Sequence, residues 1–387
     1  MLTSSERRGR LLERVDAIAP VLAADVPVGE ELRRLPDTTV AALREAGLLR
    51  LKVPASLGGD EAEPDLQFDV FERVALTNAS AAWCLFIYAD SAGAVCARLP
   101  DAGLERLLAG GDVPVVCGGG GLRPGVLEAV DGGYRLSGRF RYGSGLDAAE
   151  WVLLQGLVTG VDGRAPRVRV CVVPRDAVDV EDTWHVLGMR ATGSNDFAVD
   201  DVFVPEEMTY PPGIPPRRGG RMFRTGIVGY LGYPVPAVTV AIARRALDEL
   251  IALAPNLTRG YTRPQVLASR PAFQSFLGAA DQRLRAARAL MIADGLNLMA
   301  LADGDASDLR AAEAATRAAG ALAVRTASDV LADTVRFAGG AALRQGTVFE
   351  QAVRDLTVAA NHLLVNESAY EVHAQFLLGL PDADPLA

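Results

Sequence analysis

The feature that most constrains the fold is a change of hydrophobic period along the chain. Between residues 111 and 210 apolar side chains alternate in short runs, as in Arg167-Val168-Arg169-Val170, with glycine-containing turns between them. Before and after this stretch, apolar residues recur every three or four positions, which is typical of amphipathic helices. We therefore expect an α+β protein with an N-terminal helical domain (1–112), a central β domain (113–212) and a C-terminal helical domain (213–387).

The β domain is predicted from four apolar runs and the turns beside them. Asp131-Gly132-Gly133 and Asp162-Gly163 have the composition of hairpin turns. The four predicted strands are YRLSGRF (134–140), WVLLQGLV (151–158), RVRVCVVP (167–174) and FAVDDVFVP (197–205). A Pro/Gly/Arg linker, 211–221, follows them. Beyond it, the alanine-rich run 309–337 allows helices to approach closely, so we expect a four-helix bundle.

Composition excludes several classes of protein. The net charge of -9 argues against a nucleic-acid partner, because phosphate contacts need clustered Lys and Arg. Three histidines and four cysteines without a Cys-x-x-Cys pair give no basis for a metal site. The uncharged stretch 225–243 contains two prolines and is predicted to be a buried helix with an irregular start, not a membrane span. We expect a cytoplasmic protein with buried thiols.

Common catalytic motifs are absent from the sequence. No Gly-x-Gly-x-x-Gly motif opens a helix, and no P-loop, HExxH or Gly-x-Ser-x-Gly motif occurs. The function must therefore depend on separate polar residues around a cofactor that the chain binds.

Three separate segments carry a resemblance to a known family. They are GRFRYGSG (138–145), DTWHVLGMRATGS (182–194) followed by VFVP (202–205), and RFAGG (336–340) followed by Arg354-Asp355 and His362. With the order of helical, β and helical regions, the chain resembles the acyl-CoA dehydrogenase superfamily, with its central β-barrel or sandwich and C-terminal four-helix bundle. More narrowly, it is similar to the two-component flavin-dependent monooxygenases on that fold.

The resemblance implies an enzyme that receives its cofactor from another protein and has several partners. Reduced FMN or FAD would come from a separate reductase, and the chain would use O2 to hydroxylate or oxidise an organic small molecule, such as an aromatic or natural-product compound. The family commonly forms dimers or tetramers through the bundle, so we expect a homotetramer or dimer. Exposed apolar stripes on the alanine-rich helices would agree with that.

Candidate flavin contacts follow residue by residue from the resemblance. Tyr142 would provide a flat apolar surface for the ring, and Ser144 a hydroxyl near its polar edge. Thr192 and Ser194 would offer two more hydroxyls around Gly193, and Trp184 would border the site. The alternative is structural: a glycine-rich hairpin, a polar turn and a core tryptophan.

The C-terminal region supplies a candidate catalytic histidine. His362 is expected on a helix with Asp355 and Ala359 on adjacent turns. In the similar monooxygenases this histidine reaches flavin and substrate, where it holds the oxygenated flavin or acts as a base. A hydrogen-bonded structural histidine is the alternative. Arg336, Gly339 and Gly340 match a segment that holds the flavin across a subunit boundary, although Gly339-Gly340 equally fits a helix end.

Departures from the dehydrogenase pattern favour oxygenation. Acyl-CoA dehydrogenases carry a proton-abstracting Glu where this chain has LRQGT (343–347), and CGGGGLRPG (117–125) replaces another flavin segment. Many aromatic hydroxylases carry a histidine where Asp90 stands here. Asp90 could take over its proton chemistry only if it is buried and its pKa is shifted.

Two alternatives stay open on sequence alone. One is an acyl-CoA or acyl-carrier-protein dehydrogenase with a relocated base, in which Arg217, Arg218, Arg221 and Arg224 would bind a phosphopantetheine or nucleotide, although a solvated basic linker also explains them. The other is a non-catalytic scaffold on the same fold.

Overall fold

The computed structural model describes residues 4–118, 123–159, 167–260 and 262–387. Contacts divide the chain into two compact units, each described here by itself. The first unit comprises Met1–Glu63, Ser80–Val186 and Arg190–Gly226. The second comprises Pro64–Ala79, Leu187–Met189 and Ile227–Ala387.

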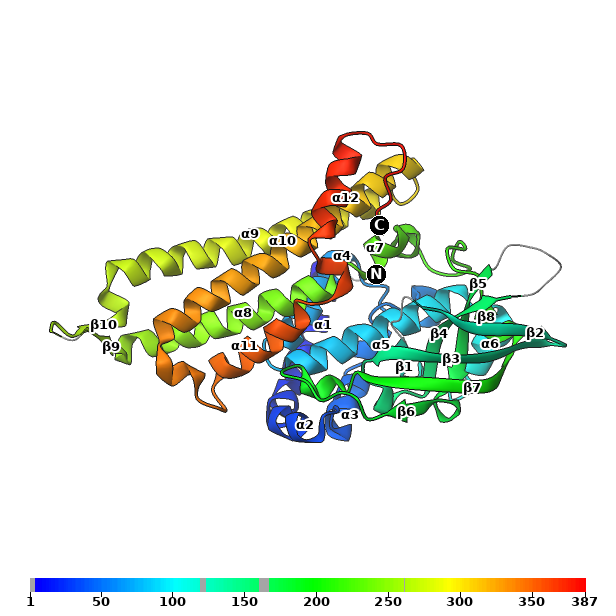
Figure 1. Ribbon diagram of the computed structural model, residues 1–387, viewed down its shortest axis with the longest axis horizontal. Helices are drawn as coiled ribbons and strands as arrows, with labels where there is room; N and C mark the ends of the chain where they lie inside the picture. Colours follow the sequence, from blue (N-terminus) through cyan, green and yellow to red (C-terminus); the bar gives the residue numbers. More distant parts are fainter. Residues whose placement is uncertain (1–3, 119–122, 160–166, 261) are drawn as a thin grey trace. The chain divides into compact units, whose positions relative to one another are not determined.

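The first unit begins with helices and continues into a sheet (Figure 1). Its helices are α1 (Ser4–Ala24), α2 (Val26–Leu32), α3 (Asp37–Glu45), α5 (Ala79–Arg98) and α6 (Asp101–Leu107). Most side chains of α5 are buried, because its sequence is apolar on nearly every face. This helix therefore forms the centre of the helical part of the unit.

Within the described residues, the region predicted to be β forms an eight-stranded mixed sheet, which belongs to the same unit as the N-terminal helices. Its path runs β6-β7-β3-β2-β4-β5-β8, and β1 pairs in parallel with β4. The strands are β1 (Val116–Gly118), β2 (Gly125–Val130), β3 (Gly133–Gly143), β4 (Trp151–Val158), β5 (Arg167–Pro174), β6 (Asp179–Glu181), β7 (Asn195–Pro205) and β8 (Thr209–Tyr210). All four predicted strands are confirmed. The turn 131–133 joins β2 to antiparallel β3, whereas Asp162-Gly163 lies outside the described residues.

One irregularity in the sheet positions the candidate site. The pairing of β3 with β7 shifts register twice, the second time between Phe140 and Gly143. Within this shift Tyr142 has φ 61°, a left-handed conformation that is uncommon for a residue other than glycine. The shift is a β-bulge, a feature that redirects side chains at the end of a strand. The last residues of β3 therefore leave the regular alternation of the sheet.

The second unit contains the C-terminal helices that the sequence predicted, together with one helix from the N-terminal region. Its helices are α4 (Pro64–Ala75), α7 (Gly226–Leu231), α8 (Pro234–Leu253), α9 (Pro271–Leu301), α10 (Ala306–Ala338), α11 (Val348–Ala359) and α12 (Ser368–Leu377), and a short hairpin pairs β9 (Thr258–Arg259) with β10 (Gln265–Val266). Helix α10 packs on α8, α9 and α12, and α8 also packs on α4 and α11 (Figure 1). Helix α4 precedes the sheet in sequence but packs with the bundle.

The uncharged stretch 225–243 forms α7 and the start of α8. Pro234 and Pro236 lie in the first turn of α8, where proline is tolerated because the first backbone N–H groups have no helical partner. Two stretches of the described chain, Ala79–Arg98 and Gly226–Asn256, are long and apolar enough to cross a membrane. Most of each stretch is buried inside the protein, and buried core helices meet the same criteria of length and hydropathy.

Candidate active site

A buried chain of hydroxyl groups lies at the end of β3 in the first unit. Trp83 Nε1 donates a hydrogen bond to Ser144 Oγ at 3.2 Å. Ser144 Oγ lies 2.7 Å from Ser194 Oγ, and Ser194 Oγ lies 2.7 Å from Thr192 Oγ1. All three hydroxyl residues are buried. Sequence analysis predicted Ser144, Thr192 and Ser194 as separate flavin contacts. In the structure their hydroxyl groups form one hydrogen-bonded network.

Gly145 sets the backbone geometry of this network. It has φ 73°, and its N–H donates to the carbonyl of Thr192 at 2.7 Å. Its own carbonyl accepts a hydrogen bond from the Tyr88 hydroxyl at 2.9 Å. A Cβ at this position would lie 2.2 Å from the Tyr88 hydroxyl oxygen, so no side chain fits without displacing Tyr88. The glycine after Ser144 therefore permits the close approach of α5, β3 and the 190–194 segment.

Two aromatic side chains lie beside the hydroxyl chain. Tyr142 is 58% exposed, two residues before Ser144, and Trp184 is half-buried. Their ring centroids are 6.4 Å apart in an edge-to-face arrangement. Trp184 is thus not the core tryptophan of the structural alternative. An exposed tyrosine held in a left-handed conformation points to a functional constraint, because packing does not require it.

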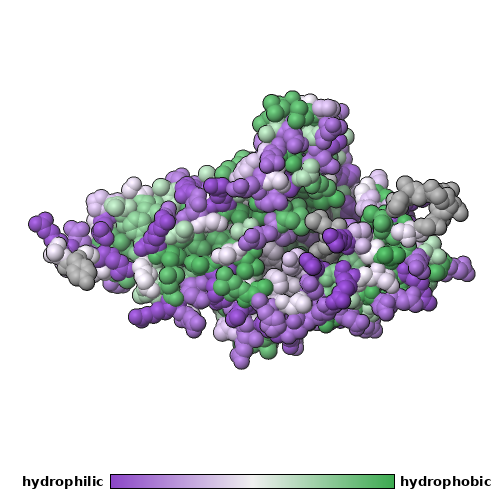
Figure 2. Space-filling model, viewed as in Figure 1, coloured by the Kyte–Doolittle hydropathy of each residue, from purple (hydrophilic) through white to green (hydrophobic). Residues whose placement is uncertain are grey.

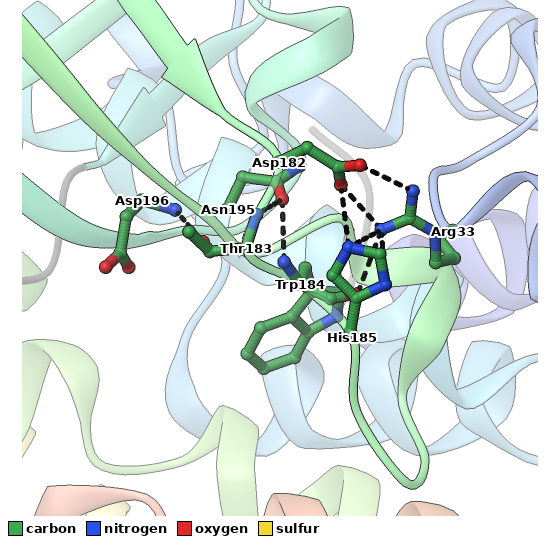
Figure 3. Close-up of polar contacts among 7 residues, drawn as sticks. All are labelled: Arg33, Asp182, Thr183, Trp184, His185, Asn195 and Asp196. Carbon is green, nitrogen blue, oxygen red and sulfur yellow. Dashed lines mark hydrogen bonds and ion pairs between the residues drawn. The ribbon is translucent and has the colours of Figure 1, made fainter.

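The loop that carries Trp184 is held by side chains from distant elements (Figure 3). Asn195 Oδ1 accepts hydrogen bonds from the backbone N–H groups of Thr183 at 3.0 Å and Trp184 at 2.9 Å. Arg33, at the end of α2, makes two hydrogen bonds to Asp182, at 2.6 and 3.0 Å, and contacts the His185 ring. The Arg33 guanidinium holds the pKa of Asp182 below its usual range. These contacts position Trp184 beside Tyr142.

The donor set fits the edge and face of a flavin ring. Tyr142 and Trp184 offer apolar ring surface, and Ser144 offers a hydroxyl that exchanges hydrogen-bond partners without moving its oxygen. A planar heterocycle with a polar edge needs this combination of stacking surface and adjustable hydroxyl. The residues of the first unit are therefore compatible with reduced FMN or FAD.

Asp90 lies on α5 in a buried ion pair. Its Oδ1 lies 2.6 Å from Nζ of Lys52, whose side chain is fully buried. Burial raises the pKa of Asp90, and the Lys52 ammonium opposes that rise. Burial also lowers the pKa of Lys52, against the effect of Asp90. The sequence condition for Asp90, burial with a shifted pKa, is met in the structure, with a cation that sequence analysis did not find.

His362, in the second unit, lies just beyond a helix and not on it as the sequence had predicted. Helix α11 ends at Ala359, and His362 is the N-cap of a short 3-10 helix, Leu363–Val365. Its Nδ1 accepts a hydrogen bond from the Leu364 N–H at 3.3 Å. Burial lowers the pKa of the half-buried ring to about 4. At neutral pH the imidazole is uncharged, and the hydrogen bond at Nδ1 assigns its proton to Nε2.

Arg336, Gly339 and Gly340 lie at the end of α10 in the second unit. Gly339 is the C-cap of α10, with φ 80°, and its N–H donates to the carbonyl of Val335 at 2.9 Å. The helix-end interpretation of this pair is thus confirmed for Gly339. Arg336 is exposed and pairs with Asp333 at 2.8 Å.

Two other sequence features have structural explanations. In the second unit, Asp355 accepts a hydrogen bond from the Met189 N–H at 2.6 Å, and Gly188 packs against the backbone of Arg354 so closely that a Cβ would clash. In the first unit, Arg218 donates to the carbonyls of Cys96 at 3.3 Å and Leu99 at 2.9 Å, at the end of α5. Arg218 therefore caps a helix, as basic side chains often do at C-termini.

The first unit thus brings together Ser144, Thr192, Ser194, Tyr142 and Trp184, and it also contains Asp90. The second unit contains His362, Arg336, Gly339 and Gly340. Sequence analysis missed the groups that support the site, which are Trp83, Arg33, Asn195 and Lys52. Lys52 alone left a signal, as the single charge in the apolar run Leu51–Pro54.

Comparisons with known proteins define the class. The acyl-CoA dehydrogenase C-terminal domain model matches residues 235–367. The structure of XiaF from Streptomyces sp., in complex with FADH2 and glycerol, aligns with a TM-score of 0.88 and 25% identity over 99% of this chain and 98% of that one. The fold is thus that of the acyl-CoA dehydrogenases.

Sequence relatives narrow the class to a family. The pigment production hydroxylase of Rhodococcus sp. (strain ATCC 21145) is 31% identical over 98% of this chain and 99% of its own. The indole-3-acetate monooxygenase of Pseudomonas putida is 32% identical over 66% of this chain and 65% of its own. The chain belongs to the two-component flavin-dependent monooxygenases of the acyl-CoA dehydrogenase superfamily. It is the oxygenase component, an oxidoreductase that uses reduced flavin from a separate reductase to oxidise a small molecule.

Proposed function

We propose that the hydroxyl chain of Ser144, Ser194 and Thr192 binds the polar edge of the reduced flavin, with Tyr142 and Trp184 beside the ring. The observation that carries this proposal is the hydrogen bond of Trp83 to the buried Ser144 hydroxyl, two residues after the exposed Tyr142 ring and its half-buried neighbour Trp184. Reduced flavin held by these residues would supply the activation of O2, one atom of which would enter the substrate. The side chains of this site bind and orient it.

The direction of the hydrogen bonds supports a ligand-binding role for Ser144. An indole N–H only donates, so Ser144 Oγ accepts from Trp83. If Ser194 also donates to Ser144, the Ser144 proton is available to an acceptor on a ligand. Rotation of hydroxyl protons along the chain achieves this without movement of any heavy atom. The hydroxyl chain is therefore suited to the polar edge of a flavin, whose donors and acceptors change during a reaction cycle.

His362 is proposed as a hydrogen-bond donor toward flavin or substrate. Its Nδ1 accepts from the Leu364 N–H, so Nε2 carries the proton of the neutral ring and is its hydrogen-bond donor. A histidine with a pKa of about 4 is a weak base at neutral pH. Of the two roles that the family resemblance implied, holding the oxygenated flavin fits this tautomer better than acting as a base.

The substrate is proposed to be aromatic. Relatives include proteins named a pigment production hydroxylase, an indole-3-acetate monooxygenase and an FADH(2)-dependent resorcinol hydroxylase. The half-buried side chains of Trp83 and Ile87 give α5 an apolar face beside Ser144, which suits a ring. Asp90, on the same helix, is proposed to contact the substrate.

Assembly and location are also proposals. Exposed leucines lie on α9, α10 and α12, and Figure 2 shows apolar surface over the bundle helices. These leucines are Leu290, Leu296, Leu322 and Leu377, and the exposed Leu378 follows α12 directly. Apolar surface of this kind supports a homotetramer or dimer through the bundle, in which Arg336, Gly339 and Gly340 would contact the flavin of a neighbouring subunit. The four unbridged cysteines agree with a cytoplasmic location.

An anaerobic titration tests the flavin site. Reduced FMN and reduced FAD are added separately to wild type and to Ser144→Ala, and flavin absorbance is followed before and after oxygen is admitted. The loss of one hydrogen bond should weaken binding about fivefold, since such a bond contributes about 1 kcal/mol. Ser137→Ala, on β3 away from the hydroxyl chain, is the control. Equal binding by wild type and Ser144→Ala would contradict the proposal.

A further inference from the structure

Two buried thiols contact the backbone that carries the hydroxyl chain. Cys117, in β1, donates a hydrogen bond from Sγ to the carbonyl of Ser144 at 3.2 Å, and the carbonyl of Gly118 lies farther from the same sulfur, at 3.6 Å. Cys84, in α5, donates from Sγ to the carbonyl of Thr192 at 3.7 Å. Both thiols are fully buried in the first unit. Each therefore holds the main chain of a residue whose side chain belongs to the hydroxyl chain.

The backbone at Ser144 needs such a donor because the strand pairing ends before it. The last register pair between β3 and β7 joins Gly143 to Asn195. The chain then turns, with Gly145 in a left-handed conformation, so the strand ladder no longer supplies its hydrogen bonds. A buried carbonyl without a donor is costly, and a side chain can replace the ladder. The Cys117 thiol does so at the carbonyl of Ser144.

Helix α5 supplies further donors to the same region. The Tyr88 hydroxyl donates to the carbonyl of Gly145 at 2.9 Å, and Cys84 lies four residues earlier on the same helical face. The N–H of Gly145 donates to the carbonyl of Thr192 at 2.7 Å. The Cys84 thiol therefore acts on a carbonyl that already joins the two segments of the site. These contacts together set the separation of the hydroxyl oxygens.

Burial keeps both sulfurs protonated. It raises the pKa of Cys117 to about 12 and the pKa of Cys84 well above its ordinary value. Only a protonated thiol can donate a hydrogen bond, so both donors persist at neutral pH. The thiolate is also the form of cysteine that peroxides oxidise. Buried thiols can therefore support a site at which oxygen is activated and remain reduced.

The other two cysteines provide an internal comparison. Cys96 and Cys171 are equally buried. Cys96 is twelve residues after Cys84 on α5, which is about 18 Å along the helix axis. Cys171 lies in β5, where its register partner is Thr209 of β8. Burial in the core accounts for these two thiols, whereas Cys84 and Cys117 also contact the backbone of the site.

Resting on the proposed function, we propose that Cys84 and Cys117 are positioning residues for the reduced flavin. Their thiols hold the two carbonyls and thereby orient the hydroxyl groups that bind the polar edge of the ring. The thiols act through the backbone, and no bond to sulfur forms or breaks. Binding of flavin to the hydroxyl chain should therefore change the strength of both S–H hydrogen bonds.

Infrared spectroscopy of the S–H stretch tests this proposal, because the band lies where other protein groups absorb little and moves to lower frequency when the thiol donates. Spectra of the protein are recorded under anaerobic conditions with and without reduced FMN or FAD. In wild type, the difference spectrum should show shifted S–H bands. These features should be lost in Cys84→Ala/Cys117→Ala and retained in Cys171→Ala. If the double variant does not fold, each single variant should lose one feature.

Flavin affinity separates positioning from packing. Cys117→Ala removes a donor, whereas Cys117→Ser keeps one in a side chain of similar shape. We expect Cys117→Ala to bind reduced flavin about two- to fivefold more weakly than wild type, and Cys117→Ser to bind it nearly as well as wild type. Cys171→Ala removes the same volume from the same unit. It should lose similar stability in urea unfolding and keep wild-type flavin affinity.

The outcomes are distinct. The inference is wrong if wild type binds reduced flavin without any shift of the S–H bands, or if the shifted bands persist when both thiols are removed. It is also wrong if Cys117→Ser loses as much flavin affinity as Cys117→Ala, or if neither loses any. Failure of wild type to bind reduced flavin in the same samples would instead contradict the proposed function.

Discussion

Trp83 and Ser144 come from a helix and a strand end 61 residues apart, and a hydrogen bond of 3.2 Å joins them. The indole therefore serves two surfaces: its half-buried ring lies on the face of α5 that also carries Ile87, and its N–H donates to the hydroxyl chain. A change at Trp83 should affect both flavin and substrate. Four further relationships in the structure lead to predictions.

The choice of residue at position 142 should depend on the backbone conformation of Tyr142 as well as on its ring. At φ 61° an asparagine is tolerated, whereas a β-branched residue is strained. We expect Tyr142→Val to lower the free energy of unfolding by about 1–2 kcal/mol relative to Tyr142→Asn, as measured by urea denaturation. Both variants should bind reduced flavin more weakly than wild type. Equal stability of the two would mean that the conformation is not strained, and wild-type flavin affinity would exclude an aromatic contact.

Asn195 should control the order of the Trp184 loop. Its Oδ1 accepts from two backbone N–H groups, and Asn195→Ala leaves both without this acceptor. We expect a loss of about 1–3 kcal/mol in unfolding free energy and lower fluorescence anisotropy of Trp184, measured in a Trp83→Phe/Trp151→Phe background. Asn195→Asp keeps the acceptor and is the matched control. Wild-type anisotropy in Asn195→Ala would show that Arg33 alone holds the loop.

The pKa of His362 predicts a dependence of stability on acid. Burial lowers this pKa to about 4, against about 6.5 in the unfolded chain. The folded state therefore binds fewer protons, so this contribution to stability is complete above pH 6.5 and is lost as the pH falls toward 4. Histidine signals in NMR spectra, assigned with His362→Asn, should show that this ring stays neutral at pH 5.5.

The matched variant for this prediction is His362→Asn, whose amide oxygen can replace Nδ1 as the cap. Between pH 6.5 and 4.5 its unfolding free energy should fall less steeply than that of wild type. Identical slopes for the two proteins, or a His362 signal that titrates near pH 6.5, would show that burial does not control this ring.

Asp355 should stabilise the second unit. It is buried, and it accepts the Met189 N–H at 2.6 Å. Asp355→Ala leaves this N–H without its partner, and we expect a loss of about 1–3 kcal/mol in thermal or urea unfolding. Asp355→Asn retains an oxygen acceptor and should lose less. If both variants lose the same amount, charge and not the hydrogen bond is what matters at this position.

Much of the fold could be predicted from sequence, because buried apolar residues recur every three or four positions in helices and every second position in strands. The four strands and the long helix around 309–337 were found in this way. His362 was placed on a helix because the apolar period continues past Ala359. The helix ends there because Asn361 Nδ2 donates to the carbonyl of Thr357 at 2.7 Å, a local competition that periodicity does not reveal.

The candidate site was predicted only in part, for a different reason. Ser144, Thr192 and Ser194 lie in recognisable segments, and their hydroxyls do meet. The partners Arg33 and Asp182 are 149 residues apart. Lys52 and Asp90 likewise come from separate elements. No local pattern relates such pairs, because only the tertiary fold brings them together.

Helix α5 is held at two points, near its middle by the Tyr88 hydroxyl on the Gly145 carbonyl and at its end by Arg218 on the Leu99 carbonyl. An inserted or deleted residue between Trp83 and Asp90 would turn one relative to the other by about 100°. The carboxylate would then leave the helix face that carries Trp83, although Arg218 would still hold the end of the helix. Substitutions preserve the spacing of Trp83 and Asp90 along α5, whereas a change of one residue in helix length does not.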